Sequence, residues 1–139
     1  MIDRRDVLKL GTASVLATQA ATLAAKAAAG GVQIGRIVVF NDEFAAARSF
    51  ASDAAQNGAA QFAISGELAP ERRQALYKQL MKRPTVVVGL TTEDNAFQIK
   101  MLAGDAFHFE ASRAELAHKT ETGEQLVEWV IAPVSELGA

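Results

Sequence analysis

The chain contains no cysteine, and this single absence removes several classes of chemistry. Disulfides, thiolate metal sites, iron–sulfur clusters and covalently attached haem all require cysteine. Only two histidines are present, and none of the serines lies in the turn motif that exposes a catalytic nucleophile. We therefore assign no catalytic residue and expect no cofactor, and the identity of any metal site stays unknown.

The glycines are not arranged to hold a nucleotide. Gly30, Gly31 and Gly35 precede the first predicted strand, whereas the dinucleotide-binding fingerprint follows a strand and opens a helix. The chain also has no Gly-x-x-x-x-Gly-Lys-Ser/Thr loop to surround phosphates. Nucleotide binding therefore has no support in the sequence.

The first 29 residues carry a pattern of their own. Paired arginines precede an uncharged stretch, Leu10–Ala25, that is rich in alanine and threonine. The motif residues are Arg4, Arg5, Leu8 and Lys9. The pattern resembles the twin-arginine signal peptides of exported bacterial proteins, with Asp3 in place of the usual hydroxyl residue and Val7 in place of the commonest phenylalanine. The resemblance implies recognition by the twin-arginine translocase and a periplasmic or otherwise exported location.

This leader is expected to be removed rather than to stay in a membrane. A spanning helix needs about 20 strongly apolar residues, whereas Gln19 and Thr22 interrupt this stretch and Lys26 closes it. Small-x-small patterns that end at Ala27 and at Ala29 predict cleavage after one of these two residues. We therefore expect no lasting membrane span.

Residues 30–139 form the predicted mature domain, and they are mildly acidic. The leader, residues 1–29, carries four of the 14 basic and two of the 16 acidic side chains, so the domain keeps ten basic and fourteen acidic ones, a net charge of −4. A domain of this size can bury a single core. Its charge gives no reason to expect binding to nucleic acid or to anionic lipid.

Apolar runs rich in β-branched residues alternate with helical patterns along the domain. The predicted strands are Arg36–Phe40, Gln61–Ser65, Thr85–Leu90 and the half-exposed Ala106–Glu110. Predicted helices follow the first three strands, and the second of them buries Leu76, Tyr77, Leu80 and Met81. Successive strand–helix units predict an α/β fold: a small three-layer open sheet, mostly parallel, with about five strands.

The C-terminal third allows two structures. Ser112 and Glu115 are placed to cap a short helix, or Glu115–Thr120 pairs with Gln125–Ile131 as an antiparallel hairpin. Leu126–Ile131 is a strand in both cases. An antiparallel or irregular element is therefore expected at this end of the sheet.

Polar side chains gather where the predicted parallel strands end, which is where such sheets bind ligands. The candidate cleft consists of Asn41, Asp42, Ser65, Glu67, Thr91 and Asp94. If the first and third strands are neighbours, Asp42 and Asp94 can approach each other and hold Mg²⁺ or Ca²⁺. The alternative, which we favour, is that Asp42, Thr91, Glu93 and Asp94 cap helices and complement the positive ends of the helix dipoles.

Histidine 108 alternates with Phe107 and Phe109 in the fourth predicted strand. It should therefore lie on the opposite strand face, beside Glu110, where a pair two residues apart can tune the imidazole or bind one side of a metal. An edge-strand histidine that faces solvent is the commoner case, and it is our expectation.

Two functions remain after these exclusions. The domain is a small exported protein that acts by binding, as an accessory or partner subunit of an exported complex. The alternative is a small ligand-binding or metal-binding enzyme that uses the acidic cleft. We favour binding and lean against an enzyme, because partner binding gives a cofactor-free protein a reason to be exported folded, together with a co-exported protein.

Overall fold

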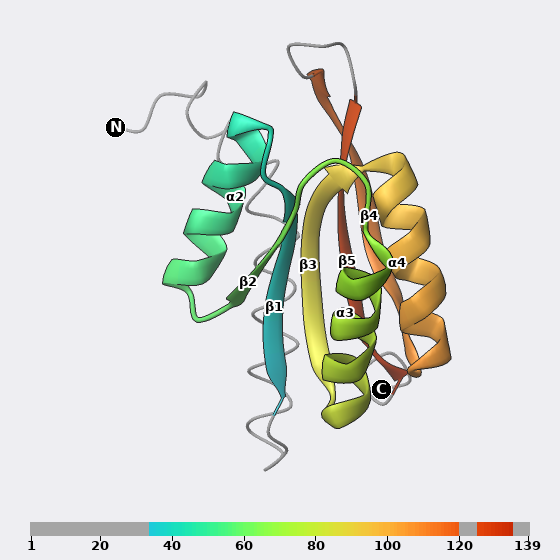
Figure 1. Cartoon of the computed structure of the whole chain (residues 1–139). Coiled ribbons are helices and arrows are strands. Elements are labelled where there is room, and N and C mark those ends of the chain that lie inside the picture. Colours follow the sequence, from blue (N-terminus) through green and yellow to red (C-terminus); the bar gives the residue numbers. More distant parts are fainter. Residues whose placement is uncertain (1–33, 120–124, 135–139) are drawn as a thin grey trace.

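The computed structural model describes residues 34–119 and 125–134. The predicted signal motif and the predicted cleavage region lie outside these residues. Strands and helices alternate along the described chain in the predicted order (Figure 1).

Five strands form one mixed sheet in the order β2-β1-β3-β5-β4. β1 (Gly35–Asn41) pairs in parallel with β2 (Ala60–Ile64) and with β3 (Thr85–Thr92). β5 (Gln125–Pro133) runs antiparallel to β3 and to the edge strand β4 (His108–Lys119). The first and third strands are thus neighbours, which is the arrangement on which the predicted strand-end cluster depends.

Helices cover both faces of the described sheet. α2 (Ala45–Gln56) lies on one face, whereas α3 (Pro70–Lys82) and α4 (Glu93–Asp105) lie on the other (Figure 1). The result is a small three-layer α/β fold, which confirms the predicted fold class. Local sequence sets the helix ends: a proline occupies the first turn of α3, and Gly58, with a φ of +95°, lies just beyond the end of α2.

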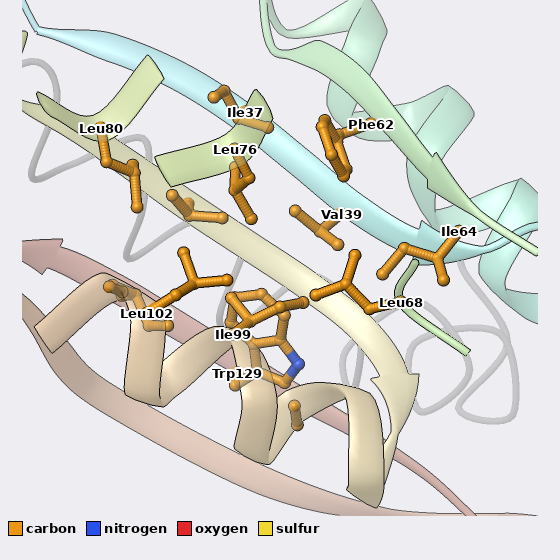
Figure 2. Close-up of a cluster of buried hydrophobic side chains, with 14 of the residues drawn as sticks. Ile37, Val39, Phe62, Ile64, Leu68, Leu76, Leu80, Ile99, Leu102 and Trp129 are labelled. Atoms are coloured by element: carbon orange, nitrogen blue, oxygen red, sulfur yellow. The ribbon is translucent and has the colours of Figure 1, made fainter. Parts of the chain in front are cut away.

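Strand side chains enter two separate cores because successive residues of a strand point to opposite faces. In β1, Val39 packs with side chains of α3 and α4, and Val38 packs with side chains of α2. Figure 2 shows the first core, in which Ile99 lies beside Trp129 and Leu76 lies near Ile37. Both strand faces are therefore apolar, as the uninterrupted β-branched runs predict.

Trp129 packs across the middle of the sheet, over Gly89 of β3, which has no side chain. Its partner in the β3–β5 register is Gly89. A Cβ atom added at Gly89 would overlap the Trp129 ring, so only glycine leaves room for the indole. The indole Nε1–H donates to the Thr91 hydroxyl at 3.0 Å, which fixes the ring in place.

The C-terminal residues form the hairpin rather than a short helix. β4 and β5 pair from His108 and Pro133 to Lys119 and Gln125. The register shifts between Glu110 and Ser112 and again beyond Glu115. The predicted antiparallel element is therefore confirmed, and of the two alternatives the chain forms the hairpin.

One apolar side chain that the sequence assigned to the interior of α3 lies at the surface. Leu76 and Leu80 of α3 are buried as predicted and Tyr77 is half-buried, but Met81 is 52 % exposed. α4 ends at Asp105. Phe107, with a φ of +60°, takes the left-handed conformation that glycine usually supplies there.

Among the helices that the structure describes, none is both long and apolar enough to span a membrane.

Candidate functional site

A buried asparagine at the end of β1 joins the loops that follow three parallel strands. The Asn41 side chain is fully buried. Its Nδ2 donates to Glu43 Oε1 at 2.7 Å and to the Gly66 carbonyl at 3.1 Å. Its Oδ1 accepts the Thr92 backbone N–H at 3.0 Å. One amide therefore contacts the segments that follow β1 and β2 as well as the end of β3.

A second buried amide completes this cluster. Asn95, in the first turn of α4, donates from Nδ2 to the Gly66 carbonyl at 2.7 Å and to Asn41 Oδ1 at 3.3 Å. Its Oδ1 accepts the Leu68 N–H at 3.1 Å, and Glu43 Oε2 accepts the Gly66 N–H at 2.6 Å. We call Asn41, Glu43, Gly66 and Asn95 the carboxyl-edge network.

The carboxyl-edge network satisfies its own hydrogen-bonding groups. Each asparagine uses its Nδ2 for two bonds and its Oδ1 for at least one. Breaking such a bond would leave a buried polar group unpaired, at a cost of about 1–3 kcal/mol. The network therefore holds the strand-end loops together, and it leaves neither amide free to bind a ligand.

The capping interpretation fails for Asp42 and Thr91, neither of which is a helix N-cap. The N-cap residues are Phe44 for α2 and Thr92 for α4, and neither makes a side-chain cap bond. The Thr91 hydroxyl accepts from Trp129 and donates to the Thr92 carbonyl at 3.0 Å. Glu93 and Asp94 do lie in the first turn of α4, where a carboxylate complements the positive end of the helix dipole.

The other predicted cleft residues form one pair and two separate side chains. Ser65 Oγ lies 2.9 Å from each carboxylate oxygen of Asp42. Glu67 and Asp94 are exposed. Within residues 34–119 and 125–134, no group of three or more His, Asp or Glu side chains is placed to hold a metal ion. Among the described residues, Asp42 therefore has no neighbouring side chains that would complete a cation site.

His108 is a core residue, which corrects the solvent-facing assignment. It is 3 % exposed, whereas Phe107 and Phe109 on either side point outward. Its Nε2 accepts the Thr85 N–H at 3.1 Å, and its Nδ1 lies 2.6 Å from the Ala106 carbonyl. Burial lowers the pKa of His108, and the hydrogen bond to Ala106 opposes this shift only in part. The imidazole therefore acts as a neutral link between β3 and the start of β4.

Glu128 is a buried carboxyl in the middle of β5. Its side chain is fully buried, and neither carboxyl oxygen has a hydrogen-bond partner. Burial raises the pKa of Glu128 to about 8, because the charged form is poorly solvated in the apolar interior. The side chain is thus protonated at neutral pH.

An exposed apolar strip runs along the outer side of α4 and around its C-terminal end. Phe97 and Met101 are one helical turn apart and are each 60 % exposed, Phe107 is 67 % exposed, and Phe109 is 44 % exposed. Phe109 lies beside Gly104 of α4, and the Phe107 N–H donates to the Gly104 carbonyl at 3.1 Å. We call Phe97, Met101, Phe107 and Phe109 the outer α4 strip.

Charged pairs hold α4 against β4 next to this strip. Lys100 Nζ lies 3.5 Å from Glu110 Oε2, and Arg113 donates to Glu93. The hydrogen bond from Arg113 lowers the pKa of Glu93, against a smaller opposing effect of burial. The apolar strip is therefore bordered by polar groups, as is typical of protein interaction surfaces.

The fold and these sites define a small three-layer α/β protein with a closed polar network and an apolar surface strip. Comparison of the chain with protein-family models, with curated proteins and with solved structures finds no match.

Three of the residues that shape these sites were missed in the sequence. Asn95 shares a helix face with the buried Ile99, and a polar residue in register with an apolar stripe signals a buried amide. Glu128 interrupts the apolar run Leu126–Ile131, and a charged residue inside an apolar strand signals a buried carboxyl. Glu43 adjoins two predicted cleft residues, but nothing in the sequence sets it apart from them.

Proposed function

We propose that this protein is exported through the twin-arginine pathway and works in the periplasm by binding a co-exported protein, as an accessory or partner subunit. The observation that carries the binding proposal is the outer α4 strip. The export proposal is supported by the Arg4-Arg5 motif and the uncharged stretch that follows it.

The outer α4 strip has the properties of a docking surface for an apolar face of another protein. A soluble domain gains nothing from four large apolar side chains left in water within one region. Aromatic residues and methionine are also enriched in the centres of interfaces, where they contribute much of the binding energy. Phe97 and Met101 lie one turn apart on a rigid helix, so they present a preformed surface.

The enzyme alternative has weaker support. The buried amides at the carboxyl edge are already paired with one another and with backbone groups. Asp42 remains accessible beside Ser65, but His108, which we considered as a base, is neutral and buried away from this edge in contact with Thr85. No nucleophile–base pair is formed by these candidates.

We expect the variant with Phe97→Ser and Met101→Ser to lose its partner. Both side chains are exposed, so the substitutions should leave the fold intact while they remove about 2 kcal/mol or more of binding energy, roughly a thirtyfold weakening. The measurement is quantitative recovery of the partner with affinity-tagged protein purified from the periplasmic fraction.

Met81→Ser is the matched control, because Met81 is also exposed but lies on α3, outside the strip. It should recover as much partner as the unmodified protein. Equal recovery by the strip variant and the control would contradict the proposed docking surface. Recovery of a second, differently tagged copy of this chain as the main partner would replace the accessory role with self-association.

We also expect replacement of Arg4 and Arg5 by lysine to block export. Lysine keeps the charge but lacks the planar, multiple-donor guanidinium of arginine. Full-length precursor should then accumulate in the cytoplasm, as detected by cell fractionation and mass measurement. Normal amounts of processed protein in the periplasm would refute the twin-arginine assignment.

A further inference from the structure

The exposed side of α4 carries charge as well as apolar surface. Asp94, Phe97, Met101 and Asp105 follow one another at intervals of three or four residues, so they lie along one line of the helix. All four side chains are exposed. The helical part of the outer α4 strip therefore lies between two carboxylates, which are about 16 Å apart along the helix axis.

These two carboxylates are not neutralised by the part of the chain that the structure describes. Within that part, neither Asp94 nor Asp105 forms an ion pair. Arg73 of α3 also reaches α4, but it donates to the neutral side-chain amide of Gln98 at 2.8 Å. The other charged side chains beside the strip pair with each other, as Lys100 with Glu110 and Arg113 with Glu93. The outer α4 strip is therefore bordered by an excess of negative charge.

Asp105 lies where its own helix disfavours a negative charge. It is the last residue of α4, and the last turn contains no basic side chain. The C-terminal end of a helix is the negative end of its dipole, so a cation is favoured there. Asp94, by contrast, lies in the first turn, where the dipole favours a carboxylate. A cation from another molecule would therefore be stabilised by Asp105 and by the helix end together.

Aromatic side chains surround the same end of the helix. Phe107 and Phe109 are exposed there, close to Asp105 in the sequence and in contact with the last turn of α4. A carboxylate beside exposed rings suits a guanidinium, which pairs with the carboxylate and stacks its plane on a ring. The chain contains one such stack, in which Arg72 lies 4.0 Å from the centroid of the Phe62 ring. The C-terminal end of α4 thus has the chemistry to receive an arginine side chain.

We propose that the partner of the outer α4 strip presents an amphipathic helix with a basic side chain at each end of its apolar face. The apolar side chains of this helix pack on Phe97 and Met101. An arginine at one end pairs with Asp105 beside the aromatic rings, and a basic residue at the other end pairs with Asp94. Residues about three turns apart face the same way on a helix, so one partner helix can reach both aspartates. The identity of this partner rests on the proposed function, because the same surface binds it.

Two synthetic peptides of about 18 residues, or five helical turns, test the charge of the partner. Both form a helix with leucines on one face. The first carries two arginines about three turns apart at the ends of that face, and the second carries glutamates in their place. The full chain should bind the arginine peptide at least about tenfold more tightly at low ionic strength, as measured by fluorescence anisotropy of labelled peptide. Added salt should reduce the difference, because it screens charges at the surface.

The variant with Asp94→Asn and Asp105→Asn should reduce this preference to less than about twofold. Both side chains are exposed, so the fold should stay intact. Asp53→Asn is the control, because it removes an exposed carboxylate from α2 on the opposite face of the sheet, and it should keep the full preference. Equal affinity of the native protein for the two peptides, or an undiminished preference in the double variant, would overturn the proposed partner.

The variant with Phe97→Ser and Met101→Ser separates this result from the proposed function. It should weaken the binding of both peptides alike, because it removes apolar contacts and keeps both aspartates. If the native protein bound both peptides equally and this variant lost both, the basic partner would be refuted and the docking surface would stand. Unchanged binding by this variant would refute the docking surface itself. A dimer of the full chain in sedimentation that these substitutions dissociate would overturn the proposal, since a second copy would then occupy the strip.

Discussion

Replacing Gly89 with alanine is expected to destabilise the protein by about 3 kcal/mol or more, near the upper end for overpacking of a core. The added methyl group would overlap the Trp129 ring. The ring has little freedom to move, because it is 2 % exposed and its Nε1–H is bonded to Thr91. Chemical denaturation of the full chain, followed by Trp129 fluorescence, measures the change.

Gly104→Ala is the matched control for this substitution. At Gly104 a new Cβ would only reach ordinary contact with Phe109 at 3.8 Å. Alanine also favours helix over glycine by up to about 1 kcal/mol, so this variant should be as stable as the native protein or slightly more so. Similar stability of the two variants would mean that Trp129 does not pack over Gly89.

The stability of the full chain should fall as the pH rises from about 5 to about 8. Burial raises the pKa of Glu128 to about 8, above the ordinary value of 4.5, so the folded state holds a proton that the unfolded state has already released. Stability is therefore complete below the ordinary pKa and is lost as the pH rises through the folded pKa. The loss is on the order of 3–5 kcal/mol. Denaturant midpoints measured across this pH range give the slope of the free energy of unfolding against pH.

Glu128→Gln should remove most of this pH dependence, because glutamine has nearly the same shape and does not titrate. Glu110→Gln is the control in the neighbouring strand, where Glu110 is partly exposed and contacts Lys100. It should retain the slope, since Glu128 is unchanged. If the native protein had the same stability at pH 5 and at pH 8, Glu128 would have to be either exposed or paired, which would contradict the structure.

The order of the elements could be predicted because each strand and helix has a strong local pattern. Arg36–Phe40 and Thr85–Leu90 are β-branched runs without polar alternation, and both become central strands. For the C-terminal residues, the local pattern allowed both a hairpin and a short helix. The choice between them depends on whether β5 finds a neighbour in β3, which is a contact between distant segments.

The assignment of polar residues was less successful because their partners lie far away in the sequence. Asn41 was placed at the strand end, but its bond to Thr92 spans 51 residues. His108 was placed on the correct side of its alternation, yet the side that faces the protein is the histidine side and not the phenylalanine side. Hydrophobicity alone predicts the wrong face, because Phe107 and Phe109 are more apolar than His108 and would be expected to face the interior.

The two register shifts in β4 limit how another protein can attach to this edge of the sheet. A straight edge strand offers a regular row of backbone N–H and C=O groups, to which a foreign strand can add. In β4 the pairing slips after Glu110 and again after Glu115, so the regular spacing is interrupted twice along twelve residues. Uncontrolled strand-to-strand aggregation is thereby discouraged at this edge, and recognition there has to rely on side-chain shape rather than on extension of the sheet.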